Sequence, residues 1–188
     1  MEKKFLIVAL AILTMASCGT RHYKKITQLD GLHFDSLSVD TVVPLTTKEK
    51  SPELKLHIGL TYIKGKNADQ INAALLRSGI LSPDYLSLSD EKLGVKAAVD
   101  SFVNVYSRSY IQDYSAILKQ DPEHAASLNN SYEVRTHIES HADHILNYFA
   151  NIHYYGGGIH AINQNLVRNF NTRTGKLITL DDIFAPGY

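Results

Sequence analysis

The feature that most constrains the fold is a run of three glycines, Gly156–Gly158, between an upstream stretch rich in aromatic and β-branched residues and a downstream one that carries Leu166, Val167 and Phe170. Such stretches are typical of β-strands buried on one or both faces. Glycine has no Cβ and adopts positive φ freely, so the run can turn sharply, bulge, or bring its backbone close to another element. The sequence therefore predicts a strand over 145–155, a glycine turn, and a second strand over 163–171.

The segment after the second predicted strand also carries turn signals. Residues 171–175 supply side-chain oxygens and a glycine suited to a tight reversal. A third short strand is expected over 176–180. Asp181 and Asp182 are then well placed to cap a helix that begins near Ile183.

The remaining elements follow from periodicity. Alternating apolar and polar residues predict three more strands, over 36–45, 53–63 and 131–138. Asn67 and Gln70 resemble a capping box for a short helix that stops at Gly79. Strands cluster instead of alternating strictly with helices, so we expect an α+β fold: a mainly antiparallel β-sheet with one long and one short helix packed on it.

The long helix is expected to begin at a Ser89 cap and to end at Asp121. Apolar and tyrosine side chains three or four residues apart should form the stripe that packs on the sheet: Val95, Val99, Phe102, Val103, Tyr106, Tyr110, Tyr114, Ile117 and Leu118. Its tyrosines could form a sugar-binding platform, but a stripe of this kind is more often core, with hydroxyls at the rim.

The first 17 residues have the features of a signal peptide. A charged start precedes an apolar run that is too short to span a hydrocarbon core of roughly 30 Å. The run ends at the single cysteine of the chain, Cys18, in a sequence that resembles a bacterial lipobox. We expect cleavage before Cys18 and lipidation of its thiol; an ordinary secretory signal is the alternative.

This processing divides the chain into a signal peptide (1–17), a solvated tether (18–35) and one α+β domain (36–188). Acyl chains on Cys18 would hold the protein at a membrane. The residue after the cysteine is Gly19 and not Asp, which resembles the pattern of lipoproteins sent to the outer membrane, so we expect that location if the cell has two membranes. The processed chain carries 17 basic and 18 acidic side chains, which is no electrostatic footprint for nucleic acid.

Metal and catalytic motifs are weak. One cluster offers the imidazole and carboxylate groups that zinc accepts: His137, Glu139, His141, Asp143 and His144. We interpret these residues as polar side chains around a hairpin tip. The sequence has no Gly-x-Ser-x-Gly elbow, and its Ser-x-x-Lys match at 89–92 reads as a helix cap. We therefore expect no catalytic residue, no metal and no cofactor.

One stretch carries a family resemblance. Residues 157–160, Gly-Gly-Ile-His, resemble the Gly-Gly-Ala-His motif of a family of bacterial envelope domains of unknown function, and 169–171, 174–176 and 180–184 resemble its downstream pattern. That family occurs in a lysozyme-sensing anti-sigma factor, beside polysaccharide deacetylase domains, and in envelope lipoproteins. Only part of the family's length is covered, so we expect a domain incomplete at its C-terminus, with an exposed sheet edge that favours dimerisation or poor solubility.

The best candidate binding site is the glycine turn with its flanking side chains: Tyr155, Gly156, Gly157, Gly158 and His160. Bare backbone beside Tyr and His presents donors, acceptors and a stacking face to a ligand. The purely structural alternative is a turn in which His160 hydrogen-bonds the surrounding backbone. We expect a noncatalytic envelope lipoprotein domain that binds peptidoglycan or a lysozyme-like protein; the alternative is the accessory half of a glycan-modifying enzyme.

Overall fold

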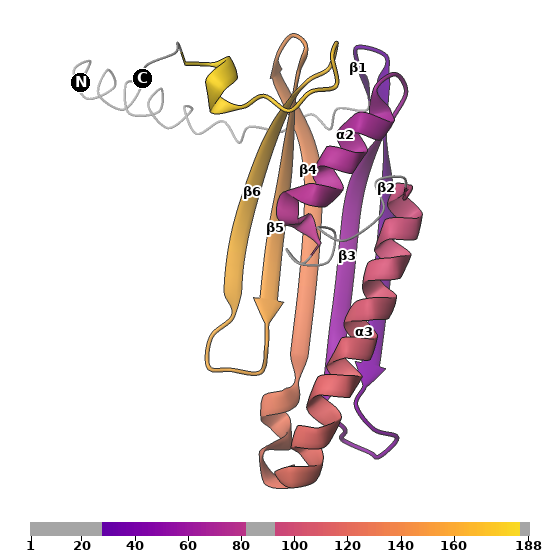
Figure 1. The fold of residues 1–188 in the computed structure, drawn as a ribbon, viewed down its shortest axis with the longest axis vertical. Helices are drawn as coiled ribbons and strands as arrows, with labels where there is room; N and C mark the ends of the chain where they lie inside the picture. The colour runs from indigo at the N-terminus through magenta and orange to yellow at the C-terminus, as the bar shows by residue number, and fades with distance from the viewer. Residues whose placement is uncertain (1–27, 82–92, 185–188) are drawn as a thin grey trace, which may run out of the picture.

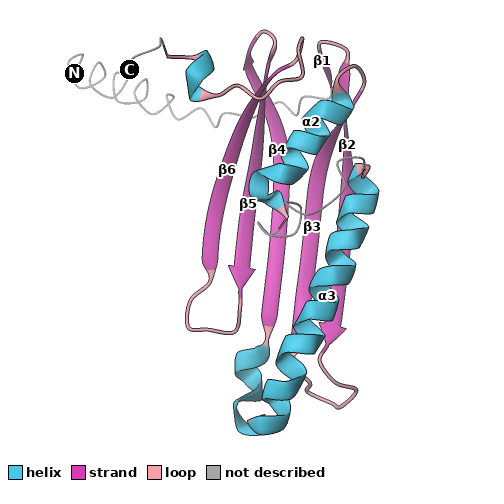
Figure 2. Cartoon of the chain, in the orientation of Figure 1, coloured by secondary structure: helices cyan, strands magenta, loops and turns pink. Residues whose placement is uncertain are grey.

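The computed structural model describes residues 28–81 and 93–184 (Figure 1). Six strands form one sheet in the order β1 to β6, and two helices pack on it (Figure 2). The α+β prediction with a mainly antiparallel sheet, one long helix and one short helix is therefore confirmed. The elements are β1 (Gln28–Leu29), β2 (Leu32–Pro44), β3 (Glu53–Lys64), α2 (Ala68–Leu75), α3 (Val95–Gln120), β4 (Asn130–Ala142), β5 (Ile145–Tyr155) and β6 (Ile162–Asn171).

The sheet contains one parallel pair, β3 with β4, and every other pair is antiparallel. A parallel connection requires a crossover of a dozen or more residues. The segment between Lys64 and Asn130 is that crossover, and it carries both helices. As a result α2 and α3 lie on the same face of the sheet (Figure 1).

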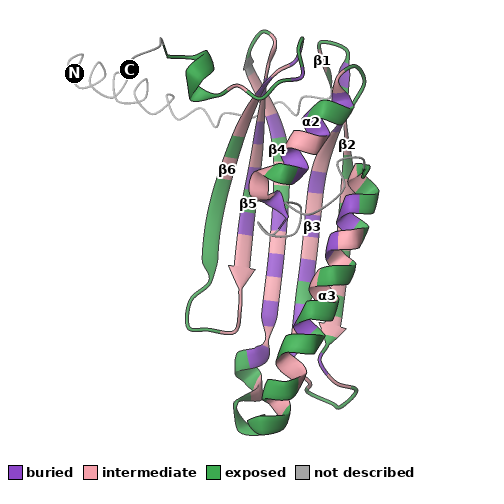
Figure 3. Ribbon diagram, viewed as in Figure 1, coloured by how far each residue is buried: buried purple, intermediate pink, exposed green. Residues whose placement is uncertain are grey.

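The core lies between the helices and this inner face (Figure 3). Strand alternation places every second side chain inward, so Leu54, Leu56, Ile58 and Leu60 of β3 are buried. Phe102 of α3 is fully buried, as predicted, whereas Ile117 is 45% exposed. The C-terminal end of α3 extends beyond the ends of the strands (Figure 1), so side chains there have less of the sheet to pack against.

Helix α3 begins at Val95 with Gly94 as its N-cap residue, so the predicted start at Ser89 is too early; Ser89 itself lies outside the described residues. The predicted tether boundary is too late, because β1 and the first residues of β2 lie within 28–35 and Leu32 is buried. Pairing with β3 recruits these residues into the sheet, since His33 lies opposite Lys64.

Asn67 is the N-cap residue of α2, but its side chain makes no capping hydrogen bond. Its backbone has φ 63°, and its side-chain amide donates to the carbonyl oxygens of Thr172 and Arg173 at 3.5 and 3.0 Å. The capping-box prediction is therefore wrong. The amide joins the start of α2 to the turn after β6 instead.

The C-terminal predictions also need correction. Residues 176–180 form no strand; a single bridge joins Leu177 to Phe170. The helix expected at Ile183 is one 3-10 turn over Leu180–Asp182, in which Thr179 and Asp182 form the capping box. Within the described chain β6 is therefore an edge strand, and Ile162 and Val167 are 61% and 45% exposed.

Candidate functional site

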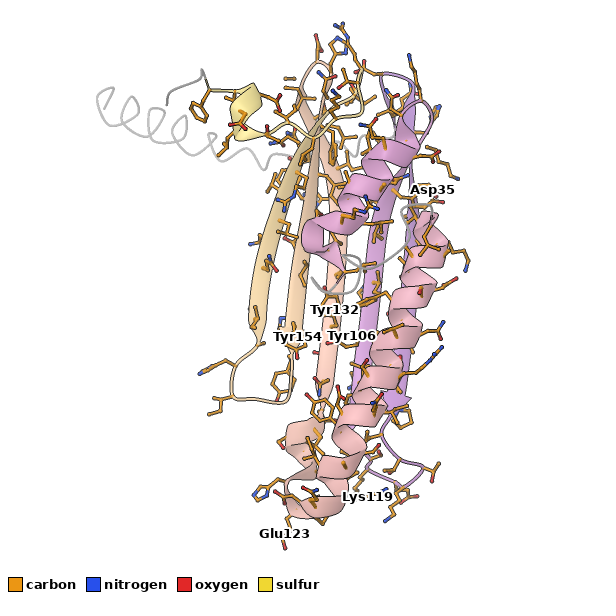
Figure 4. The ribbon with its side chains drawn as sticks, viewed as in Figure 1. Asp35, Tyr106, Lys119, Glu123, Tyr132 and Tyr154 are labelled. Atoms are coloured by element: carbon orange, nitrogen blue, oxygen red, sulfur yellow. The ribbon has the colours of Figure 1, made fainter. Side chains whose placement is uncertain are left out.

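A tyrosine-walled cavity of about 450 Å³ lies between α3 and the inner face of strands β4 to β6. Figure 4 shows its three tyrosines, Tyr106, Tyr132 and Tyr154, gathered where α3 passes β4 and β5. The lining residues are Gly79, Tyr106, Tyr132, Ile152, Tyr154, Ile162 and Gln164. We call this cavity the tyrosine pocket.

The strand register brings the pocket tyrosines together. Tyr132 of β4 lies directly opposite Tyr154 of β5, with ring centroids 6.3 Å apart. Tyr106 of α3 reaches down to Tyr132, with centroids at 5.6 Å, and Phe102 packs behind both rings. Tilted contacts at these distances are favourable for aromatic rings, so the walls of the pocket are preorganised.

The hydroxyl groups of the pocket have partners of their own. Tyr132 donates to the carbonyl oxygen of Ile80 at 3.0 Å, which ties β4 to the segment after α2. Burial raises the pKa of the Tyr132 phenol above its usual value. Burial is also the main cause that raises the pKa of Tyr106, with nearby Tyr154 adding to it. These phenols are therefore neutral at physiological pH and can act as hydrogen-bonding groups but not as bases.

The three glycines form the turn between β5 and β6, and two of them have distinct structural roles. A Cβ on Gly156 would lie 2.5 Å from the Tyr154 hydroxyl oxygen, so Gly156 leaves room for that ring. Gly157 has φ 82°, and a Cβ there would lie 1.7 Å from the carbonyl oxygen of Ser127. The turn thus docks on the 3-10 segment Pro122–Leu128, and of the three roles considered for the glycine run Gly157 has the close backbone approach.

The other predicted site residues lie around the turn without converging on one cavity. Gly158 is exposed, and a Cβ there would meet nothing within 4 Å. His160 is exposed, and within the described chain its ring makes no hydrogen bond to the backbone. Tyr155 is half-buried and, by strand alternation, lies on the opposite face from Tyr154. Ile159 at the tip is 93% exposed.

Sequence reasoning missed the tyrosine pocket because its residues come from three distant segments. The tyrosines expected in one stripe along α3 lie in two different environments. Tyr106 joins the pocket, whereas Tyr110 is buried and donates to the Leu128 carbonyl oxygen at 3.0 Å, and burial raises its pKa to about 12. The sequence did offer one signal for the pocket. Inward strand positions carry tyrosine, although phenylalanine would fill nearly the same volume without a hydroxyl group.

A larger hollow of about 710 Å³ lies between α2, the start of α3 and the paired ends of β2 and β3. Its buried amide and several of its charged groups are already paired. Asn72 accepts from the Ile63 amide and donates to the Ile63 carbonyl at 2.9 and 2.8 Å. At its edge, a hydrogen bond from Lys64 is the main cause that lowers the pKa of Asp35 to about 2. The only buried polar side chain in the described lining, Asn72, is thus committed to the backbone of β3 and is not free for a ligand.

His137 and His144 of the β4–β5 hairpin have separate partners. His137 stacks on Phe149 at 4.8 Å between centroids. His144 donates from Nδ1 to Asp30 at 2.8 Å and accepts from Arg173 at 2.6 Å. In residues 28–81 and 93–184, no three metal-ligating side chains gather into a metal site. His141 lies in β4, and nothing further is described of its side chain.

Comparison with known proteins identifies solved structures that have a similar fold. No family model and no curated protein matches the chain. A crystal structure of a DUF3298 family member from Bacteroides fragilis is similar, with TM-score 0.74 and 22% identity over 86% of this chain and 64% of its own. A DUF3298 family protein from Pseudomonas aeruginosa PAO1 has TM-score 0.51 and 16% identity over 84% of this chain and 60% of its own. The chain thus has the fold of proteins from a family of unknown function and spans less than two thirds of their length.

Proposed function

We propose that this chain is a noncatalytic binding domain of the DUF3298 type, held in the cell envelope by lipid on Cys18, and that its tyrosine pocket takes a sugar unit of the cell-wall glycan. The observation that carries the proposal is the grouping of Tyr106, Tyr132 and Tyr154 around a cavity of about 450 Å³. A cavity of this size suits one small ligand unit.

The lining of the pocket matches the chemistry of a sugar. Tyrosine combines an apolar ring face with a polar hydroxyl, and a pyranose likewise has an apolar face and a rim of hydroxyl groups. Ile152 and Ile162 add apolar surface, and exposed Gln164 at the rim supplies an amide donor and acceptor. The pocket therefore offers stacking in its interior and hydrogen bonding at its mouth.

Binding fits this site better than catalysis does. The described lining contains no carboxylate, histidine, cysteine or lysine. Its ionisable groups are phenols, and those of Tyr106 and Tyr132 have raised pKa values, so they supply no general base at neutral pH. An accessory role beside a separate glycan-modifying enzyme is compatible with the same pocket.

A lysozyme-like protein is the second candidate ligand, favoured by the tip of the β5–β6 turn. There Ile159 is 93% exposed, next to exposed His160. A large apolar side chain projecting from an ordered turn is suited to insertion into a protein partner. This candidate uses the turn and leaves the tyrosine pocket free.

Co-sedimentation of the purified protein with peptidoglycan sacculi, and pull-down with lysozyme, test these proposals. Tyr154→Ala should weaken sedimentation with sacculi by about tenfold, or about 1.4 kcal/mol. The matched control is Tyr155→Ala, the neighbouring tyrosine on the opposite face of β5. Loss of binding in Tyr155→Ala but not in Tyr154→Ala would refute the pocket. Loss of lysozyme capture in His160→Ala or Ile159→Ala would favour the second candidate.

The proposed attachment to a membrane through Cys18 is tested by a separate experiment. No helix of the described residues is both long and apolar enough to cross a bilayer. We expect the mature protein to begin at Cys18 and to carry acyl chains, which mass spectrometry of its N-terminal peptide would detect. Cys18→Ser should move the protein from the membrane fraction to the soluble envelope fraction. A mature N-terminus at any other residue would contradict the lipoprotein proposal.

A further inference from the structure

The outer face of the sheet, opposite α2 and α3, carries an unusual concentration of asparagine on its last two strands. Asparagine is depleted from β-strands because it favours turns and caps. These positions are neither turns nor caps, so the fold itself gives no reason for the residue type. The outward asparagines are Asn147 and Asn151 of β5 and Asn163, Asn165 and Asn169 of β6.

The register aligns polar side chains into rows that run across the strands. One row crosses five strands, with each residue opposite the next: Asp40, His57, Glu133, His153 and Asn163. The adjacent row contains Arg135, Asn151 and Asn165 on β4, β5 and β6. Directly opposed side chains have Cβ atoms about 5 Å apart. The two rows therefore form a continuous grid of hydrogen-bonding groups on one face.

A hollow of about 280 Å³ lies in this grid. Six outward polar side chains line it: Glu133, Arg135, Asn151, His153, Asn163 and Asn165. We call these residues the asparagine face. The hollow lies on β4 to β6, on the opposite side of the sheet from the tyrosine pocket.

Several hydrogen-bonding groups of the asparagine face are unused. His153 donates from Nδ1 to Asn163 Oδ1 at 2.8 Å, which leaves the His153 Nε2 acceptor and the Asn163 amide donors free. Within the described chain the side-chain amides of Asn151 and Asn165 have no partner. The hollow is thus lined by both unused donors and unused acceptors.

The charges of the asparagine face are balanced. Arg135 forms an ion pair with Glu133, and His57 contacts Asp40 at the end of the longer row. No group of three metal-ligating side chains occurs within the described ranges. A ligand for this face is therefore recognised through many neutral hydrogen bonds and not through its charge.

We propose that the asparagine face is a second binding site, and that it takes a hydroxyl-rich saccharide lying across β4 to β6. Amide groups match neighbouring sugar hydroxyls because each amide both donates and accepts. The open outer face of the sheet has room for an extended chain, whereas the tyrosine pocket takes a single unit. Together, the two surfaces let one domain contact glycan on both sides of the sheet.

Titration of ¹⁵N-labelled protein with chitotetraose and with cellotetraose tests this site. The side-chain amide signals of Asn151, Asn163 and Asn165 report on the hollow directly. We expect these signals to shift on titration, and Asn165→Val to weaken the apparent affinity by about tenfold. Valine is favoured in strands, so the fold should be retained. The control is Ser38→Val, an exposed position of the same face on β2, outside the hollow.

The outcomes separate the two sites. Shifts at the asparagine amides that disappear in Asn165→Val and persist in Ser38→Val support the second site. A response to chitotetraose alone would assign recognition to N-acetylated sugars, and a response to both probes would assign it to hydroxyl groups. Shifts confined to Tyr106, Tyr132 and Tyr154 would overturn the second site and leave the tyrosine pocket standing. No shift with either probe would also overturn it.

Discussion

Replacement of Gly157 by alanine should destabilise the domain far more than the same replacement at Gly158. Gly157 has φ 82°, and a Cβ there would stand 1.7 Å from the Ser127 carbonyl oxygen. An alanine in the left-handed region costs about 1–2 kcal/mol. The clash involves two backbones, so the turn must also move away from the 3-10 segment, and overpacking of this kind costs about 1–3 kcal/mol.

We therefore expect Gly157→Ala to lower the free energy of unfolding by about 2–5 kcal/mol. Gly158→Ala is the matched control, because a Cβ at that position meets nothing within 4 Å and its φ is not positive. Its effect should stay within about 0.5 kcal/mol, as for other surface substitutions. Urea unfolding of both variants, followed by far-UV circular dichroism, measures the two values.

Equal effects of the two alanines would refute the reasoning. A small loss in Gly157→Ala would mean that the turn does not rest on Ser127 in solution. A large loss in Gly158→Ala would mean that the glycine run is required for general chain flexibility and not for one close approach.

Two further predictions concern Gly156 and Asp30. Gly156→Ala should change stability less than Gly157→Ala, because the added Cβ meets the hydroxyl end of the Tyr154 side chain, which can move. It should nevertheless weaken glycan binding as much as Tyr154→Ala does. Unchanged binding of Gly156→Ala to sacculi would contradict this. Hydrogen bonds from Thr172 and then His144 lower the pKa of Asp30 below 3.8, so the stabilisation is present above the unfolded pKa and is lost as pH falls through the folded pKa. Asp30→Asn should therefore be less stable than wild type in urea at pH 7, and the difference should narrow as the pH is lowered into the acidic range; a difference that does not change with pH would contradict the assignment.

Much of the fold could be predicted because strand and helix periodicity are local properties. The alternation of β3 and β5, the turn at the glycine run and the end of α3 at Asp121 were all readable from neighbouring residues. The errors occurred where a residue of a type that usually has a local role bonds instead to a segment far away in the sequence. Asn67 has the residue type of a cap, but the carbonyl oxygens of Thr172 and Arg173 take its amide.

The candidate site was less predictable than the fold. The sequence drew attention to the glycine run, but it could not show that Gly156 makes room for Tyr154 and that Gly157 rests on Ser127. The tyrosine pocket also depends on Tyr106, which is 48 positions before Tyr154 in the chain and meets it only because α3 packs across β4.

By itself the sequence determined the main extended and helical segments and the turn at the glycine run, since these depend on spacing and backbone freedom over a few residues. Only the tertiary structure decided that β3 and β4 run parallel, that the tyrosines of three elements enclose one cavity, and that the asparagines of β5 and β6 share an exposed face. Those facts depend on strand order and register, which are fixed by burial of the whole inner face at once.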